Sequence, residues 1–177
     1  MVRNWSGHRG AAVVLVLCGI TCLASPGTLS QTTPTASLKI VGQMTVDGKP
    51  AQTGDQFISG GAAATSKGSS GVVSIGKLGR VELQQNSTMS VTFSNSSIGG
   101  SVEAGRAEII AEKGTSTNIS VKDGSVISDG SQRTSFTIRV QAADLCVSVS
   151  VGQVEVRLGS KVARVKAGKH FSTGRPC

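Results

Sequence analysis

The sequence contains no tyrosine, one tryptophan and four phenylalanines, so aromatic residues make up only 3% of its 177 residues. Trp5 lies in an N-terminal segment that we expect to be removed, which leaves few rings on which bases or sugars could stack. Lysines and arginines are scattered singly and form no run, a pattern typical of a solvated surface of mixed charge. We therefore expect no nucleic acid among the partners.

Histidine is equally scarce, and His170 is the one histidine beyond the N-terminal segment. A nucleophilic triad would have to be built on it, but no serine lies in a Gly-x-Ser-x-Gly elbow. One histidine and two distant cysteines lack the ligand spacing of a zinc site. The sequence therefore predicts a protein that is not an enzyme, with no catalytic residues, no metal and no cofactor. A hydrolase that depends on His170 is the enzymatic alternative.

The first 24 residues have the pattern of a secretory signal peptide. Two arginines precede an apolar run at residues 11–20, and small residues follow it, which predicts cleavage between Ala24 and Ser25. The run is shorter than the roughly 20 residues of a membrane helix, and no later segment is apolar enough. We expect a periplasmic or secreted protein without a transmembrane span in its mature chain. An uncleaved N-terminal anchor is the alternative.

Four cysteines divide into two pairs along the chain. Cys18 and Cys22 lie where N-terminal lipidation occurs, but the residues before them do not fit a lipidation motif, so a lipoprotein is not favoured. Cys146 and Cys177 would remain in the mature protein. In an oxidising compartment they predict a disulfide that closes a loop of roughly 30 residues. Two separate thiols are the alternative, because the sequence gives no geometry.

The remaining composition predicts one basic domain. The chain has 18 basic and 10 acidic residues, and its net charge is +8. The predicted signal peptide contains two of the basic residues and none of the acidic ones, so the mature protein carries a net charge of about +6. Residues 25–37 are small and polar and indicate a flexible linker. From Leu38 onward, short runs of Val, Ile, Thr and Ser alternate and are broken by glycine. Residues 38–177 are thus predicted to form an all-β domain of short antiparallel strands and hairpins, rolled into a solenoid-like stack; a β-sandwich is the alternative.

The C-terminal alternation is the clearest in the sequence. Val147–Val151 and Val154–Leu158 are separated by Gly152-Gln153, a loop that suits a type II′ hairpin turn. A second two-residue loop, Gly159-Ser160, extends the pattern, so we expect a three-stranded meander with one aliphatic face. The predicted pairs are Val151 with Val154, Val149 with Val156, Val147 with Leu158, Val154 with Val165, and Val156 with Ala163.

A unit of glycine, any residue, aliphatic, Glu, aliphatic occurs three times, as GRVEL at 79–83, GRAEI at 105–109 and GQVEV at 152–156. Its glycines should lie at or next to tight turns, where a positive φ costs glycine nothing. The aliphatic residues then face inward and the glutamates outward, which favours a structural role over an acid/base set. The predicted turn glycines are Gly79, Gly105, Gly152 and Gly159, and the outward glutamates are Glu82, Glu108 and Glu155.

Glycine turns followed by alternating strand residues recur in six segments: Leu78–Leu83, Gln85–Val91, Val102–Ile109, Arg133–Ile138, Val149–Gly152 and Ala167–Gly168. Together these segments resemble the FecR domain, an extracytoplasmic β-module of bacterial regulators and secreted proteins. The resemblance covers about residues 41–171. It implies an all-β fold and an interaction or signalling role. It does not imply anti-sigma activity, because the helix and signalling extension of full regulators are not found.

The predicted function is that of a non-enzymatic FecR-like module at the cell envelope, which binds another envelope protein through strand edges or polar sheet faces. The alternative is a basic envelope component that binds anionic polymers, such as peptidoglycan-associated or lipopolysaccharide groups. Salt separates the two, because contacts made by exposed charges are screened.

Overall fold

The computed structural model describes residues 35–142, 144–174 and 177. Within these ranges the chain forms 16 β-strands and one short 3-10 helix, Gly76–Leu78, so the fold is all-β, as the alternation predicts. The signal peptide, its cleavage site at Ala24 and Ser25, and most of the predicted linker lie outside the described residues. The first strand begins at Thr35, inside the predicted linker. None of the described residues belongs to a helix with the length and hydropathy of a membrane span.

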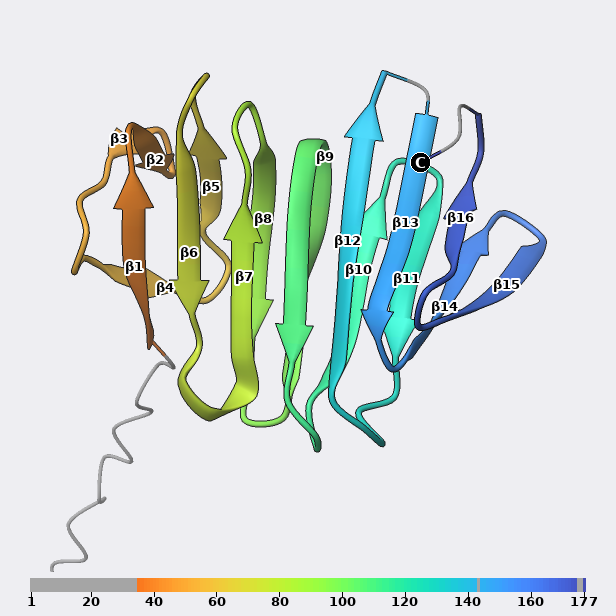
Figure 1. Ribbon diagram of the computed structural model, residues 1–177. Helices are drawn as coiled ribbons and strands as arrows, with labels where there is room; N and C mark the ends of the chain where they lie inside the picture. The colour runs from red at the N-terminus through yellow and green to blue at the C-terminus, as the bar shows by residue number, and fades with distance from the viewer. Residues whose placement is uncertain (1–34, 143, 175–176) are drawn as a thin grey trace, which may run out of the picture. The chain divides into compact units, whose positions relative to one another are not determined.

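The strands lie in two layers, called here the front and rear layers after their places in Figure 1. In order across the sheet, the front layer contains β4 (Gln56–Ile58), β1 (Thr35–Val41), β6 (Ser70–Ser74), β7 (Gly79–Leu83), the second half of β9 (Ser97–Ala111), β12 (Thr134–Gln141), β13 (Asp144–Val151) and β16 (His170–Ser172). The rear layer contains β3 (Lys49–Pro50), β2 (Met44–Val46), β5 (Ala62–Thr65), β8 (Thr88–Phe93), the first half of β9, β10 (Ser116–Val121), β11 (Gly124–Ser128), β14 (Gln153–Leu158) and β15 (Lys161–Lys166).

Alternation of side chains along each strand fills a single core between the layers. In β10, for example, Thr117, Ile119 and Val121 are buried while Asn118 and Ser120 are exposed, because successive side chains of a strand point to opposite faces. The chain passes repeatedly from one layer to the other, so the strands form a rolled stack whose two layers pack like a sandwich. The largest fully buried side chains include Phe57, Phe136, Leu83, Met89, Ile98, Ile109, Ile119 and Ile138.

The 15-residue strand β9 belongs to both layers. Residues 97–104 pair with β8 and, in parallel, with β10, whereas residues 105–111 pair with β7 and β12. Gly105, at the junction, has a φ of 85°, and its Cα lies so close to the Asn86 carbonyl oxygen that no side chain would fit. Gly105 therefore lies inside a bent strand and not in a turn between strands. The parallel β9–β10 pairing also departs from the predicted antiparallel arrangement, because β10 re-enters the rear layer in the same direction as β9.

The predicted meander is half right. The Gly159-Ser160 loop joins β14 and β15, with Val154 opposite Val165 and Val156 opposite Ala163 as predicted. Strands β13 and β14 do not pair, so the hairpin predicted at Gly152 is wrong. β13 lies between β12 and β16 in the front layer, and β14 lies between β11 and β15 in the rear layer.

The physical reason is that β13 and β14 each pair with a third strand that offers a buried apolar partner, and so they do not pair with each other. Val149 lies opposite Phe136 on β12, and Val156 lies opposite Val126 on β11. All four side chains are buried in the shared core, so the predicted aliphatic face is preserved although its two halves approach the core from opposite layers. The chain crosses between the layers at Gly152, whose φ is 77°.

Candidate functional site at the C-terminal hairpin

The groups first considered for chemistry are dispersed over the surface. His170 is exposed on β16, in register with Ser148 on β13. Within residues 35–142, 144–174 and 177, no three His, Cys, Asp or Glu side chains lie close enough together to hold a metal ion.

The glutamates of the three repeated units do not converge. Glu82 and Glu108 lie opposite each other on β7 and β9 of the front layer, whereas Glu155 lies on β14 of the rear layer. Glu82 forms an ion pair with Arg80 at 2.6 Å. Glu108 accepts a hydrogen bond of 3.0 Å from the Ser135 hydroxyl. All three are half-buried at solvent-facing positions, as the alternation predicts.

The predicted turn glycines have different environments. Gly79 follows the 3-10 helix with a φ of 130°, and Gly159 starts the β14–β15 turn with a φ of 55° and nothing near its Cα hydrogens. Gly152 instead packs its backbone against the start of β12, where an added Cβ would lie 2.7 Å from the Arg133 carbonyl oxygen. Glycine is required for contact at Gly152 and for conformation alone at Gly159.

The charge of the protein is concentrated at its C-terminal end. Residues 25–152 contain ten basic and nine acidic residues, whereas residues 153–177 contain six basic and one acidic. The last 25 residues thus carry about five of the six surplus positive charges. Most of these cations lie on or next to the β14–β15 hairpin. The basic residues are scattered singly and form no run, as stated above, but that description overlooked their excess over acidic residues in this segment.

Strand β15 lies at the rim of the rear layer and pairs with β14 alone among the described strands (Figure 1). Leu158 and Lys161 flank a two-residue turn, where the two residues form a hydrogen-bonded pair. From this pair onward, hydrogen-bonded and non-hydrogen-bonded pairs alternate along the two strands. The N–H and C=O groups of Ala163 therefore point towards β14, whereas the N–H and C=O groups of Val162 and Arg164 point away from the sheet. Val162 is 60% exposed. The edge therefore offers both unpaired backbone groups and an apolar side chain.

Glu155 organises the outer face of this hairpin. Its carboxylate lies 2.6 Å from Arg157 Nε and 3.6 Å from Arg164 Nε. The hydrogen bond from Arg157, together with the charges of both arginines, lowers the pKa of Glu155 below its ordinary value of 4.5. The two guanidinium groups are thereby held along the hairpin, while Lys161 and Lys166 form no ion pair with another described residue.

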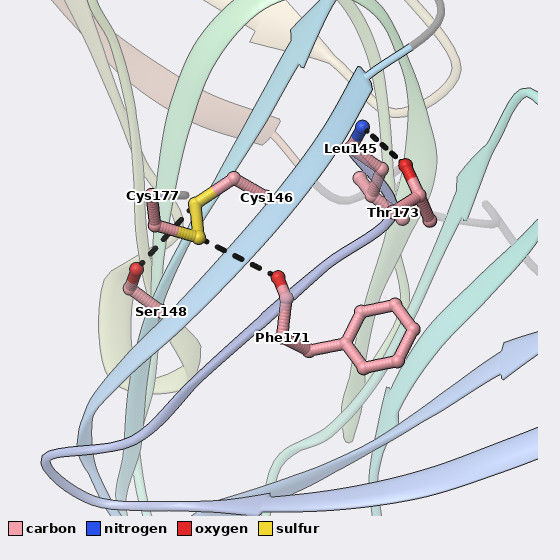
Figure 2. The surroundings of a disulfide bond; sticks show 6 residues. All are labelled: Leu145, Cys146, Ser148, Phe171, Thr173 and Cys177. Carbon is pink, nitrogen blue, oxygen red and sulfur yellow. Dashed lines mark hydrogen bonds between the residues drawn. A yellow bond between two sulfur atoms is a disulfide. The ribbon is translucent and has the colours of Figure 1, made fainter. Parts of the chain in front are cut away.

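A disulfide between Cys146 and Cys177 closes a loop of the chain that contains β14, β15 and β16 (Figure 2). It joins β13 to the chain end beyond β16, and the Phe171 carbonyl oxygen lies 3.5 Å from Cys177 Sγ. The Leu145 N–H donates to Thr173 Oγ1 at 2.9 Å, and the Thr173 N–H donates to the Leu145 carbonyl at 3.0 Å. These links hold the three-residue strand β16 against β13.

Comparison with known proteins gives a likeness in fold. No protein-family model and no curated protein sequence matches the chain. Two crystal structures, each of a candidate anti-sigma factor from Parabacteroides distasonis ATCC 8503, are similar to it with TM-scores of 0.54 and 0.53 and sequence identities of 18% and 20%. Each likeness covers 63% of this chain and 53% of the other, so the chain matches about half the length of those proteins. Identities this low show the fold alone. Membership of the FecR family therefore stays a prediction.

Proposed function

We propose that the protein is a non-enzymatic interaction module that takes part in signalling at the cell envelope, outside the cytoplasm, by binding another envelope protein. The predicted signal peptide and the fold shared with candidate anti-sigma factors support this role. The observation that carries it is the basic outer edge of β15, which pairs with no described strand and combines hydrogen-bonding backbone groups with surplus positive charge.

An unpaired strand edge binds an extended segment by adding it to the sheet, with affinity from backbone hydrogen bonds and specificity from alternate side chains. On β15 the side chains that accompany the outward backbone groups are Val162 and Arg164, and they are followed by Lys166, whose carbonyl oxygen accepts a hydrogen bond of 3.0 Å from the Lys169 N–H. A segment in which acidic and apolar residues alternate complements this row. Lysines on an edge also oppose pairing of two identical edges, so the same charges select an acidic partner over a second copy of this chain.

Proline at position 162 tests the backbone contact. The Val162 N–H points away from β14, so Val162→Pro removes a donor from the edge while the β14–β15 ladder keeps its hydrogen bonds. Val162→Thr keeps the N–H and is the matched control. With a photo-crosslinking residue at Lys166, on the same strand but outside the lining of the cleft described below, we expect cells producing the Thr variant to give one discrete protein adduct and cells producing the Pro variant to give none. The same adduct from both variants would contradict strand addition.

Retention of an anionic envelope polymer is the second candidate function, and the charge surplus in residues 153–177 favours it. Polymer binding would depend on charge and not on the backbone edge. Binding to lipopolysaccharide would then fall steeply as salt is raised, would fall in an Arg164→Glu, Lys166→Glu variant, and would be equal for Val162→Pro and Val162→Thr. A protein contact at the edge should largely persist at high salt.

A further inference from the structure

A cleft with a volume of about 600 Å³ opens between the two layers at the end of the domain that carries the disulfide. The end of β12, the start of β13 and strand β16 line it from the front layer. The β10–β11 and β14–β15 turns line it from the rear layer, and the Gly159 N–H donates to the Asp123 carbonyl at 3.3 Å, which joins these two turns. Its volume lies within the range of about 300–1,000 Å³ typical of small-molecule sites.

The most buried side chains of the cleft lining are apolar. Val121, Val140 and Leu145 form its floor and belong to the buried core, and Leu158 and Phe171 pack against that core while remaining half-exposed. A large apolar side chain that stays half-exposed beside a cavity can gain further burial from an apolar ligand.

The mouth of the cleft is charged but balanced. Lys122 and Asp123 lie on the β10–β11 turn, Lys161 follows the β14–β15 turn, and Asp144 begins β13. Two ammonium groups and two carboxylates give no net charge at the rim. The polar end of a ligand can therefore find partners of either sign there, and its net charge contributes little to affinity.

The wall that carries Phe171 is fixed by a covalent bond. Strand β16 has three residues and pairs only with β13 among the described strands, so its backbone hydrogen bonds alone would hold it weakly. The disulfide from Cys146 to Cys177 holds the chain beyond β16 in place, and Figure 2 shows the Phe171 ring on the side of β16 opposite the sulfur atoms.

We propose that this cleft binds the hydrocarbon chain of a single-chain amphiphile, such as a fatty acid or a lysolipid, with the polar head at the charged mouth. The site is independent of the β15 edge and adds a ligand to the proposed function. An alkyl chain fits because the lining offers aliphatic contacts from both layers. The lining favours an alkyl chain over a sugar or a nucleotide, because Phe171 is its one aromatic residue and its most buried side chains, Val121, Val140 and Leu145, are aliphatic.

The test is displacement of a dansyl-labelled dodecanoic acid from the mature, disulfide-bonded protein, with all amphiphiles below their micelle concentrations. We expect decanoic acid and dodecylphosphocholine to displace the probe and hexanoic acid to fail, because affinity grows with buried chain length. Displacement should not weaken from low to high salt, because the rim carries no net charge. Loss of probe binding at high salt, or equal displacement by the short and long acids, would overturn the proposal.

Two matched variants locate the site. Leu158→Asn places a polar side chain at the cleft, and we expect it to lower probe affinity about tenfold, since about two buried methylene contacts are lost. Val162→Asn makes a similar change on the same hairpin outside the cleft and should bind as the unchanged protein does. Equal affinities of the two variants would place the probe elsewhere and refute the site. The crosslinking result with Val162→Pro does not depend on the cleft, so failure of one proposal leaves the other testable.

Discussion

Two short loops near the C-terminus have nearly the same local sequence and opposite structural roles. Gly152-Gln153 and Gly159-Ser160 each join two alternating strands, and each glycine has a positive φ. At Gly159 the chain turns back and β15 pairs with β14, whereas at Gly152 it crosses from the front layer to the rear. The difference teaches that a two-residue glycine loop permits a hairpin but does not select it.

The choice is made by the strands that flank each loop. β13 has a long partner in β12, whose Phe136 and Ile138 lie opposite Val149 and Val147. The other edge of β13, where the hairpin prediction places β14, is taken by β16. β15 is hydrogen-bonded to no other described strand, and it keeps the local pairing with β14.

The largest expected effect comes from a side chain at the crossing. Gly152→Val adds a Cβ that would lie 2.7 Å from the Arg133 carbonyl oxygen, at a residue with a φ of 77°. Backbone strain and overpacking together should lower the free energy of unfolding by about 4 kcal/mol. Urea denaturation measures the free energy of unfolding. A loss of stability as small as that expected for Gly159→Ala would show that the chain crossing at Gly152 is no more constrained than the β14–β15 turn.

The disulfide sharpens the comparison, because it holds β16 at the edge of β13. Replacing both residues in a Cys146→Ser, Cys177→Ser variant should lower the free energy of unfolding by about 3 kcal/mol, given the sequence separation of 31 residues. Thermal unfolding with and without reductant checks this. Hydrogen exchange should rise first in residues 170–173 and stay slow in β14, and the reverse order would mean that the hairpin depends on the disulfide.

Alanine at the second loop should have a modest effect. Gly159 has a φ of 55° but no atom within 4 Å of an added Cβ. Gly159→Ala therefore costs only the left-handed conformation, about 1 kcal/mol. Denaturation of Gly159→Ala and Gly152→Ala side by side gives the comparison directly, and equal losses of unfolding free energy would contradict a contact role for Gly152 that Gly159 lacks.

The smallest expected effect is on how the stability of the protein falls at acid pH. Arg157 lowers the pKa of Glu155 in the folded hairpin, so this group's contribution to stability is complete above its ordinary value of 4.5 and is lost as the pH falls through the lowered value. Glu155→Gln should flatten the fall in stability on acidification, measured by the melting temperature between neutral and acid pH. Glu103→Gln, an exposed carboxylate outside the ion pairs found in the described ranges, is the control and should leave the curve unchanged.

The sequence predicted local features well and long-range ones poorly. The inward and outward positions of β14 and β15, their register and the solvent-facing glutamates follow from a period of two and a tight turn, which involve neighbouring residues only. The pairing of β13, the bend of β9 at Gly105 and the parallel β9–β10 ladder depend on residues far apart in the chain. The cleft was missed for the same reason, because its lining is drawn from five separate segments.

The sequence by itself determined that the chain is all-β, that its aliphatic residues collect in one core and that its positive charge is greatest at the C-terminal end. Periodicity and charge are properties of consecutive residues. The folded arrangement set which strands became neighbours, the pairing of Cys146 with Cys177, and the position of β15 at the rim, where it pairs with no described strand other than β14. Strands compete for partners across the whole chain, and the outcome depends on which arrangement buries the most apolar surface.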